Sequence, residues 1–153
     1  MRRSEKKILD TALIESILQE AIVCRLGLCV DNEPYVVPMN FAYRENAIYL
    51  HAAPEGKKIG MIKTNPFVCF EVDHMTEVVT SENACNWGMR YYSIIGFGEA
   101  FLIDDKKAKS DALNIIMGKY SGLNDQMYSG KSLENITVIR VEISEMTGKK
   151  SGY

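Results

Sequence analysis

Residues 47–60 read AIYLHAAPEGKKIG, and this stretch places a short apolar strand directly before a glycine and two lysines. Pro54 and Gly56 mark the exit from the strand, because proline and glycine interrupt regular structure. We predict that a helix begins near Gly56, with Lys57 and Lys58 in its first turn. The first backbone N–H groups of a helix lack partners within it, so this junction can bind a phosphate or another anion. An ordinary solvated pair of lysines would produce the same pattern.

Hydrophobic periodicity outward from this stretch predicts a mainly β fold of the α+β type. Strands are expected at residues 22–30, 34–43, 47–53, 67–73, 90–103 and 136–143, with an irregular one at 75–80. Helices are expected over 10–21, from Gly56 to Thr64 and over 104–120, where Asp104 would be the N-cap. Residues 81–89 and 121–135 read as loops, and the tail 148–153 as mobile. Consecutive strands that lie close in sequence favour a small antiparallel barrel with flanking helices, in a single domain over residues 1–153.

Proline and glycine inside two of these strands mark irregular positions. Pro38 cannot donate a hydrogen bond to a sheet, so it indicates an edge, a bulge or a close approach to the backbone. Gly96 and Gly98 lie inside the strand 90–103 and favour a bend or bulge where a barrel curves.

Composition indicates which kinds of partner the protein has and in which cellular compartment it lies. The chain of 153 residues has a net charge of −2, which gives no electrostatic case for binding nucleic acid. No apolar run approaches the ~20 residues that a membrane span needs, and the N-terminus lacks the apolar core of a secretory signal. We therefore expect a cytoplasmic protein with no membrane or nucleic-acid partner.

The four cysteines predict neither a metal site nor a disulfide framework. Cys24, Cys29, Cys69 and Cys85 form no C-x-x-C pair and no cluster with histidine. The first three lie in apolar strand-like runs and are expected in the core, whereas Cys85 lies in a polar segment.

Two histidines and one pair of carboxylates are the remaining candidates for chemistry. His51 lies in the strand YLHAA, where a backbone hydrogen bond could satisfy it or where its ring could line a ligand pocket. His74 reads as an exposed turn residue, and Glu71 and Asp73 share one face of a strand as ordinary surface charges. No G-x-S-x-G, Walker or G-x-G-x-x-G pattern is present. The residues alone thus predict a small barrel with one phosphate site.

Four segments in this order resemble the split-barrel flavin-binding proteins related to pyridoxamine 5′-phosphate oxidase, over residues 8–148. They are YVVPMNFAY (35–43), IYLHAAPEGKKIGMIKTNP (48–66), VCFEVD (68–73) and RYYSIIGFGEA (90–100). Within that superfamily they look most like the nitroimidazole-resistance (Nim-type) branch. The most specific pattern is H-x-A-x-x-G-x-K, which runs from His51 to Lys58, and Y-x-S-(I/V)-x-x-F-G-x-A, from Tyr91 to Ala100, supports it.

The resemblance implies a homodimer of six-stranded split barrels with flavin mononucleotide (FMN) held between the subunits. Gly56, Lys57 and Lys58 would surround the FMN phosphate. The isoalloxazine ring would meet the backbone around Pro38, Met39, Asn40 and Phe41 and around Leu50, His51 and Ala52. Arg90 and Ser93 would come from the long strand, and Trp87 and Tyr91 from the partner subunit. In the resistance proteins a histidine at the place of His51 belongs to the ligand pocket, which makes His51 the candidate catalytic residue.

The resemblance also implies an activity, and two departures from the family's sequence pattern narrow the range of expected reactions. Tyr92 stands where an arginine or glutamate is common, and the sequence stops at Tyr153 without the arginine-containing tail of true pyridoxamine phosphate oxidases. We therefore expect reduction of nitroaromatic or other small electrophilic compounds, with a reduced nicotinamide as donor, and not oxidation of pyridoxamine phosphate. The alternative is a non-catalytic module that carries flavin or haem for sensing, storage or delivery, with His51 as the candidate axial ligand.

Overall fold

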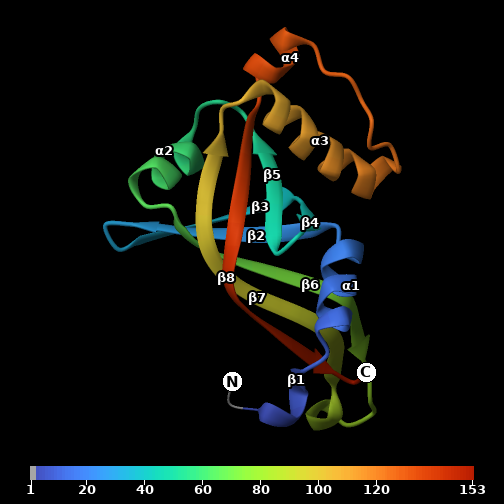
Figure 1. The fold of residues 1–153 in the computed structure, drawn as a ribbon. Coiled ribbons are helices and arrows are strands. Elements are labelled where there is room, and N and C mark those ends of the chain that lie inside the picture. Colours follow the sequence, from blue (N-terminus) through green and yellow to red (C-terminus); the bar gives the residue numbers. More distant parts are fainter. Residues whose placement is uncertain (1–2) are drawn as a thin grey trace.

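An antiparallel sheet of eight strands organises residues 3–153, the part of the chain that the computed structural model describes (Figure 1). The strands are β1 (Lys7–Ile8), β2 (Val23–Val30), β3 (Glu33–Asn40), β4 (Ala42–Arg44), β5 (Ala47–Ala52), β6 (Phe67–Val79), β7 (Gly88–Ile103) and β8 (Thr137–Ser151). They lie in the order β3-β2-β6-β7-β8-β5-β4, and β1 pairs with β8. Since β3 and β4 are separated in the chain only by Phe41, the sheet curls into a split barrel. The predicted fold class is confirmed, with eight strands where six were expected; residues 1 and 2 of the predicted domain lie outside the described residues.

Helices flank the barrel at both of its ends (Figure 1). They are α1 (Thr11–Glu20), α2 (Lys57–Thr64), α3 (Lys106–Ser121) and α4 (Gly130–Glu134), with 3₁₀ turns η1 (Ser4–Lys6) and η2 (Ala84–Asn86). Asp10 caps α1, since its carboxylate accepts from the Ala12 N–H at 2.9 Å. The predicted cap of α3 is wrong by one residue, because Asp105 and not Asp104 accepts from the helix. Both α4 and η2 lie in segments that were expected to be loops.

Two tight turns fix the register of the neighbouring hairpins. Asp31 and Asn32 link β2 to β3 with φ values of 51° and 63°, and Glu45 and Asn46 link β4 to β5 with 52° and 57°. Two consecutive residues with positive φ match the twist of an antiparallel hairpin. The predicted second strand is divided at Phe41 into β3 and β4, and β3 lies at an edge of the sheet, as Pro38 indicated.

Two of the three long strands, β6 and β8, extend well beyond their predicted bounds, whereas β7 begins only two residues before its predicted start. Residues 75–79 continue β6 past an irregularity after His74 and do not form a separate strand. The expectation of a mobile tail is wrong, since β8 runs to Ser151 and its Gly148 pairs with Ile8 of β1. The bend predicted from the glycines is confirmed at Gly98, where the pairing of β7 with β8 shifts. A Cβ on Gly98 would lie 2.1 Å from the Glu142 carbonyl oxygen, so only glycine fits.

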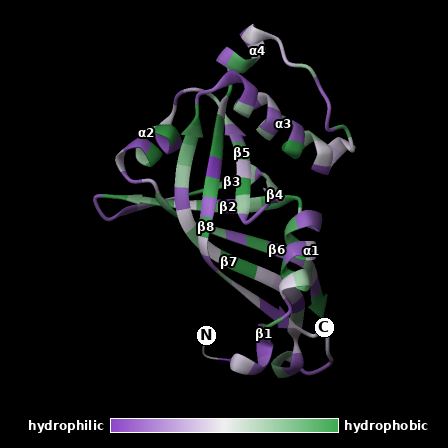
Figure 2. Cartoon of the chain, viewed as in Figure 1, coloured by the Kyte–Doolittle hydropathy of each residue, from purple (hydrophilic) through white to green (hydrophobic). Residues whose placement is uncertain are grey.

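The apolar side chains form two clusters, one on each side of the sheet. The larger one fills the barrel and includes Phe41, Leu50 and Phe70. The smaller lies under α3 and α4, where Leu113 and Leu133 pack on Val138. Figure 2 shows the corresponding mixture of hydrophobic and hydrophilic residues along the strands. Within residues 3–153, none of the helices has the length and apolar character needed to cross a bilayer.

The cysteines correct one expectation. Cys24 is buried in the barrel, but Cys69 is half-buried and Cys29 is exposed. Residues alternate between the two faces of a strand, and Cys29, five positions after Cys24 on β2, points outward. All four thiols are free, and Cys85 is exposed as expected.

Candidate functional site

The start of α2 has the open form that the sequence predicted. Gly56 is its N-cap, with φ 130° and ψ 171°, and no side chain caps the helix. A Cβ placed on Gly56 would meet nothing within 4 Å, so the space beside this turn is free. The first N–H groups of α2 therefore face an unobstructed surface, which suits an anion.

The two lysines at this junction differ in what they contact. The Nζ of Lys57 lies 2.6 Å from Oε1 of Glu33 and 5.1 Å from the centre of the Tyr35 ring. This pairing lowers the pKa of the Glu33 carboxyl group. Lys58 is half-buried, and among residues 3–153 the structure shows no ion pair for it. Lys58 is thus the better placed of the two cations for a ligand.

No hydrogen bond to another of the residues 3–153 satisfies the Nδ1 atom of His51. This atom is buried. His51 pairs with Val138 across β5 and β8, and Tyr49 pairs with Arg140, so His51 and Arg140 are diagonal neighbours on one face. The Nε atom of Arg140 is also buried without a partner, while its Nη1 lies 3.1 Å from Oε1 of Glu142. Two unpartnered polar atoms therefore lie close together on the face opposite to the barrel core.

The residues expected beneath the flavin ring divide into accessible and inaccessible ones. Pro38 and Asn40 are exposed and Ala52 is half-buried, whereas the side chains of Met39, Phe41 and Leu50 are buried in the barrel. The expected contacts at these last positions involve the backbone.

Tyr120 of α3 contacts the backbone of Phe41, and Lys119 of the same helix lies against its ring. The Phe41 N–H donates to the Tyr120 hydroxyl at 2.8 Å, and that hydroxyl lies 3.1 Å from the Phe41 carbonyl oxygen and 2.6 Å from that of Ile22. The Lys119 ammonium donates to the Leu18 carbonyl at 2.9 Å and lies 3.5 Å from the centre of the Phe41 ring. Burial lowers the pKa of Lys119 to about 8. The Phe41 backbone is thus linked to α3, and this link fixes the corner between β3 and β4.

The remaining predicted site residues lie at the other end of the barrel. His51 lies opposite Val138 of β8, and Val138 in turn lies opposite Ile103, the last residue of β7. Tyr91 lies near the start of β7, opposite Ser151. Tyr91 and Ile103 are twelve residues apart along β7, a span of roughly 40 Å in a straight strand. Figure 1 shows the start of β7 beside the two termini and its end beside α2 and α3. One chain does not bring Tyr91 together with His51.

The neighbours of Tyr91 share that distant position and have partners of their own. Arg90 lies 3.4 Å from Glu77, the Trp87 indole donates to the Ser81 carbonyl at 2.6 Å, and Ser93 donates to Glu71 at 3.4 Å. The Trp87 side chain is nevertheless 55% exposed.

Glu71 and Asp73 lie on one face, as predicted, and both bind the guanidinium of Arg25. They are held in an ion-pair network and do not form a free acid–base pair. His74 contacts Glu20 at 3.3 Å from within β6, so the expectation of an exposed turn residue is wrong.

An apolar outward face was not foreseen from the sequence. The strand register places exposed apolar side chains from three strands on the face that carries Arg140: Val36, Phe67, Ile95 and Phe101. A groove of about 310 Å³ lies in it, lined in part by Cys29, Val36, Cys69 and Phe97. We call this surface the outward face. Exposed apolar surface of this kind is typical of a binding site.

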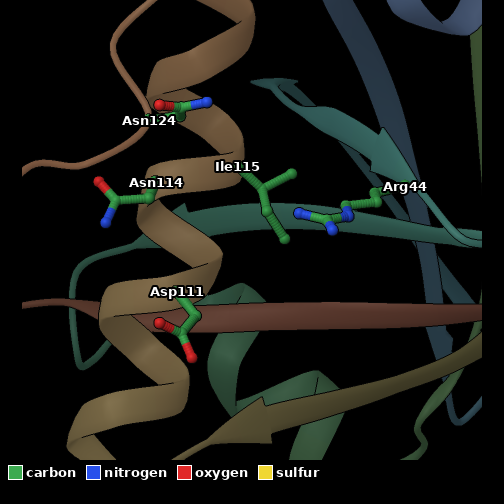
Figure 3. A pocket seen from close by; sticks show the side chains of 5 residues that line it. All are labelled: Arg44, Asp111, Asn114, Ile115 and Asn124. Atoms are coloured by element: carbon green, nitrogen blue, oxygen red, sulfur yellow. The ribbon is translucent and has the colours of Figure 1, made fainter.

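A second cavity, of about 340 Å³, lies between α3 and β4 and contains none of the predicted site residues (Figure 3). Figure 3 shows Ile115 pointing toward Arg44 and Asn114 pointing away from it. The Asn114 amide already bonds with the Gln126 backbone at 3.2 and 2.9 Å, and Arg44 pairs with Glu45 at 3.2 Å. Asn114 and Arg44 are thus engaged, so this cavity is the weaker candidate. The described residues contain no group of three or more His, Cys, Asp or Glu side chains that could hold a metal ion.

Residues 10–150 match the protein family described as pyridoxamine 5′-phosphate oxidase. The chain belongs to the pyridoxamine 5′-phosphate oxidase family. The predicted resemblance to this family is thus confirmed, and it extends over nearly the whole chain.

Individual proteins of known sequence or structure are also similar to this chain. It is 38% identical to a candidate 5-nitroimidazole antibiotic resistance protein of Bacteroides thetaiotaomicron, with a TM-score of 0.82 over 94% of this chain and 86% of that one. A FAD- and haem-binding protein of Mycobacterium smegmatis has the same fold, with a TM-score of 0.86 over 97% of this chain and 74% of that one at 17% identity. An uncharacterized Rhizobium meliloti protein is 27% identical over 66 residues, a segment that spans 43% of each chain.

Proposed function

We propose that this chain is a flavin-binding protein that holds FMN between two copies of itself and reduces nitroaromatic or other small electrophilic compounds. The observation that carries the proposal is the succession of unpartnered groups along β5 and into α2. The His51 Nδ1 atom lacks a partner, the start of α2 is open, and Lys58 has no ion pair among the described residues.

These residues fit the parts of a flavin mononucleotide. The N–H groups of α2 and the Lys58 ammonium suit a phosphate, because a helix N-terminus and a cation both favour negative charge. His51 lies on the strand that leads into this turn, where its ring nitrogen could hydrogen-bond to the ring system or to a substrate. Bound flavin would supply the electron transfer, while the protein binds, orients and excludes water. His51 would orient the substrate or exchange a proton with it through Nδ1.

A second copy would complete the site. Tyr91 lies roughly 40 Å from His51 along a straight strand and Trp87 precedes it in the chain, so both would join His51 from another subunit. The exposed apolar residues of the outward face would be covered in such a dimer. Identity to the Bacteroides thetaiotaomicron protein supports nitroaromatic compounds as the substrate class.

The second candidate function is a carrier of flavin or haem without catalysis. The unpartnered imidazole of His51 favours it, since a free ring nitrogen is what an axial iron ligand requires. The Mycobacterium smegmatis protein of the same fold binds both FAD and haem.

Spectra and sedimentation of the purified protein separate these functions. The first proposal predicts a dimer whose bound flavin is bleached by NADH or NADPH and reoxidised by a 5-nitroimidazole. Flavin that binds but is never reduced would favour the carrier, and a Soret band lost in His51→Ala would favour haem. A protein that binds neither cofactor, or that sediments as one chain at micromolar concentration, would contradict the proposal.

A further inference from the structure

His51 and Arg140 lie on the same face of the sheet and share one energetically unfavourable feature. Each has a buried nitrogen, Nδ1 and Nε respectively, that no group of the described chain contacts. A buried polar atom without a partner is rare in folded proteins and destabilises them. As diagonal neighbours on antiparallel strands, the two residues have Cα atoms ~7–8 Å apart, within reach of one small ligand.

We propose that His51 and Arg140 together bind the planar two-oxygen group, nitro or carboxylate, of an aromatic substrate. This inference rests on the proposed function, because it gives the substrate of that site its anchor. Arg140 is a residue that the sequence analysis did not single out. Its guanidinium is planar and presents N–H groups in a fixed fork, which matches two coplanar oxygens.

The neighbours of Arg140 favour an aromatic ligand. In one row across three strands, Arg140 has Tyr49 on one side and Phe101 on the other. The Phe101 side chain is 44% exposed, so it offers an apolar surface beside the guanidinium. Offset stacking on such a ring would stabilise an aromatic ligand whose polar end reaches Arg140.

The charges around Arg140 exclude a phosphate and favour a group with little charge. Glu142 already pairs with Arg140, and Glu99 lies directly opposite Glu142 on β7. Two carboxylates beside one guanidinium would repel a dianion. A neutral nitro group avoids this penalty and a carboxylate with a single charge reduces it, whereas the phosphate of FMN could bind at Lys58 and the start of α2.

Binding of 4-nitrobenzoate, measured by calorimetry with and without FMN, tests the inference. Arg140→Met should weaken this binding at least tenfold, the effect of losing a charge-assisted hydrogen bond. It should leave the Kd for FMN within threefold. Arg44→Met is the matched control, since Arg44 is an arginine that also pairs with a glutamate, and it should change neither value. Benzyl alcohol, which lacks the two-oxygen group, should bind wild type and Arg140→Met equally.

Glu142→Gln gives a result of opposite sign and guards against a misfolded Arg140 variant. It releases the guanidinium from its ion pair, so 4-nitrobenzoate should bind more than twofold tighter. Equal binding of 4-nitrobenzoate by wild type and both Arg140→Met and Glu142→Gln would overturn the inference while leaving flavin binding intact. A tenfold loss of FMN affinity in Arg140→Met without any loss for 4-nitrobenzoate would also overturn it. Failure to bind FMN, with 4-nitrobenzoate binding still dependent on Arg140, would instead reject the proposed flavin function alone.

Discussion

Replacing His51 by leucine should stabilise the ligand-free protein while it damages ligand binding. The Nδ1 atom of His51 is buried without a partner, and such an atom costs ~1–3 kcal/mol relative to an apolar or paired one. Leucine has a similar size and no polar atom, so it removes this penalty. We expect His51→Leu to raise the free energy of unfolding by ~1–2 kcal/mol. For a chain of this length that corresponds to a Tm increase of ~3–6 °C.

The assay is urea unfolding of the flavin-free protein, followed by circular dichroism, with flavin affinity measured on the same samples. His74→Leu is the matched control, because His74 does have a partner, Glu20, at 3.3 Å. Losing this partly exposed pair should reduce the free energy of unfolding by at most ~1 kcal/mol. A loss of more than ~1 kcal/mol in His51→Leu would refute the reasoning, since it would mean that the chain itself satisfies His51. Stability gained without any loss of ligand binding would show that His51 is no part of the site.

Three further changes test other contacts. Lys58→Ala should weaken FMN binding by ~1.5–3 kcal/mol and Lys57→Ala by less, because Glu33 already pairs with Lys57; an unchanged Kd in Lys58→Ala, by fluorescence titration, would place the phosphate elsewhere. Tyr120→Phe leaves the Phe41 N–H without its partner and should cost ~1–3 kcal/mol in urea unfolding; a cost below ~0.5 kcal/mol would be within the range of ordinary surface substitutions and would argue against that link. Lys119 has its pKa lowered to about 8 from 10.5, so the folded state is penalised while the ammonium is charged and the free energy of unfolding should rise as the pH increases from 8 to 10.5. After allowance for partial exposure the gain is up to ~2 kcal/mol, and it should be absent in Lys119→Met; parallel pH profiles of the two proteins would contradict it.

The local features of the fold could be predicted because neighbours in sequence determine them. The helix start at Gly56, the cap at Asp10 and the turn at Asp31 and Asn32 depend on residues within a few positions of each other. The end of β8 was missed because it pairs with the start of β7 and with β1, which are about 55 and 140 residues away in the chain, and no local pattern reveals such pairing.

The candidate site was predicted only in part, for a related reason. The junction at Gly56 is local, whereas the proximity of His51 to Arg140 follows from the register of two strands that are distant in the chain. The alternation of residues 136–143 could have placed Arg140 on the polar face of its strand, but not beside a histidine. The bond between Tyr120 and Phe41 joins residues 79 positions apart and had no sequence signal.

The central claim, that this chain binds FMN, is tested most directly by titrating the flavin-free protein with FMN and following the flavin absorption spectrum. We predict saturable binding of one FMN per chain, with resolved shoulders on the visible flavin band as the ring leaves water. A spectrum that stays that of free FMN up to saturating micromolar protein would contradict the claim.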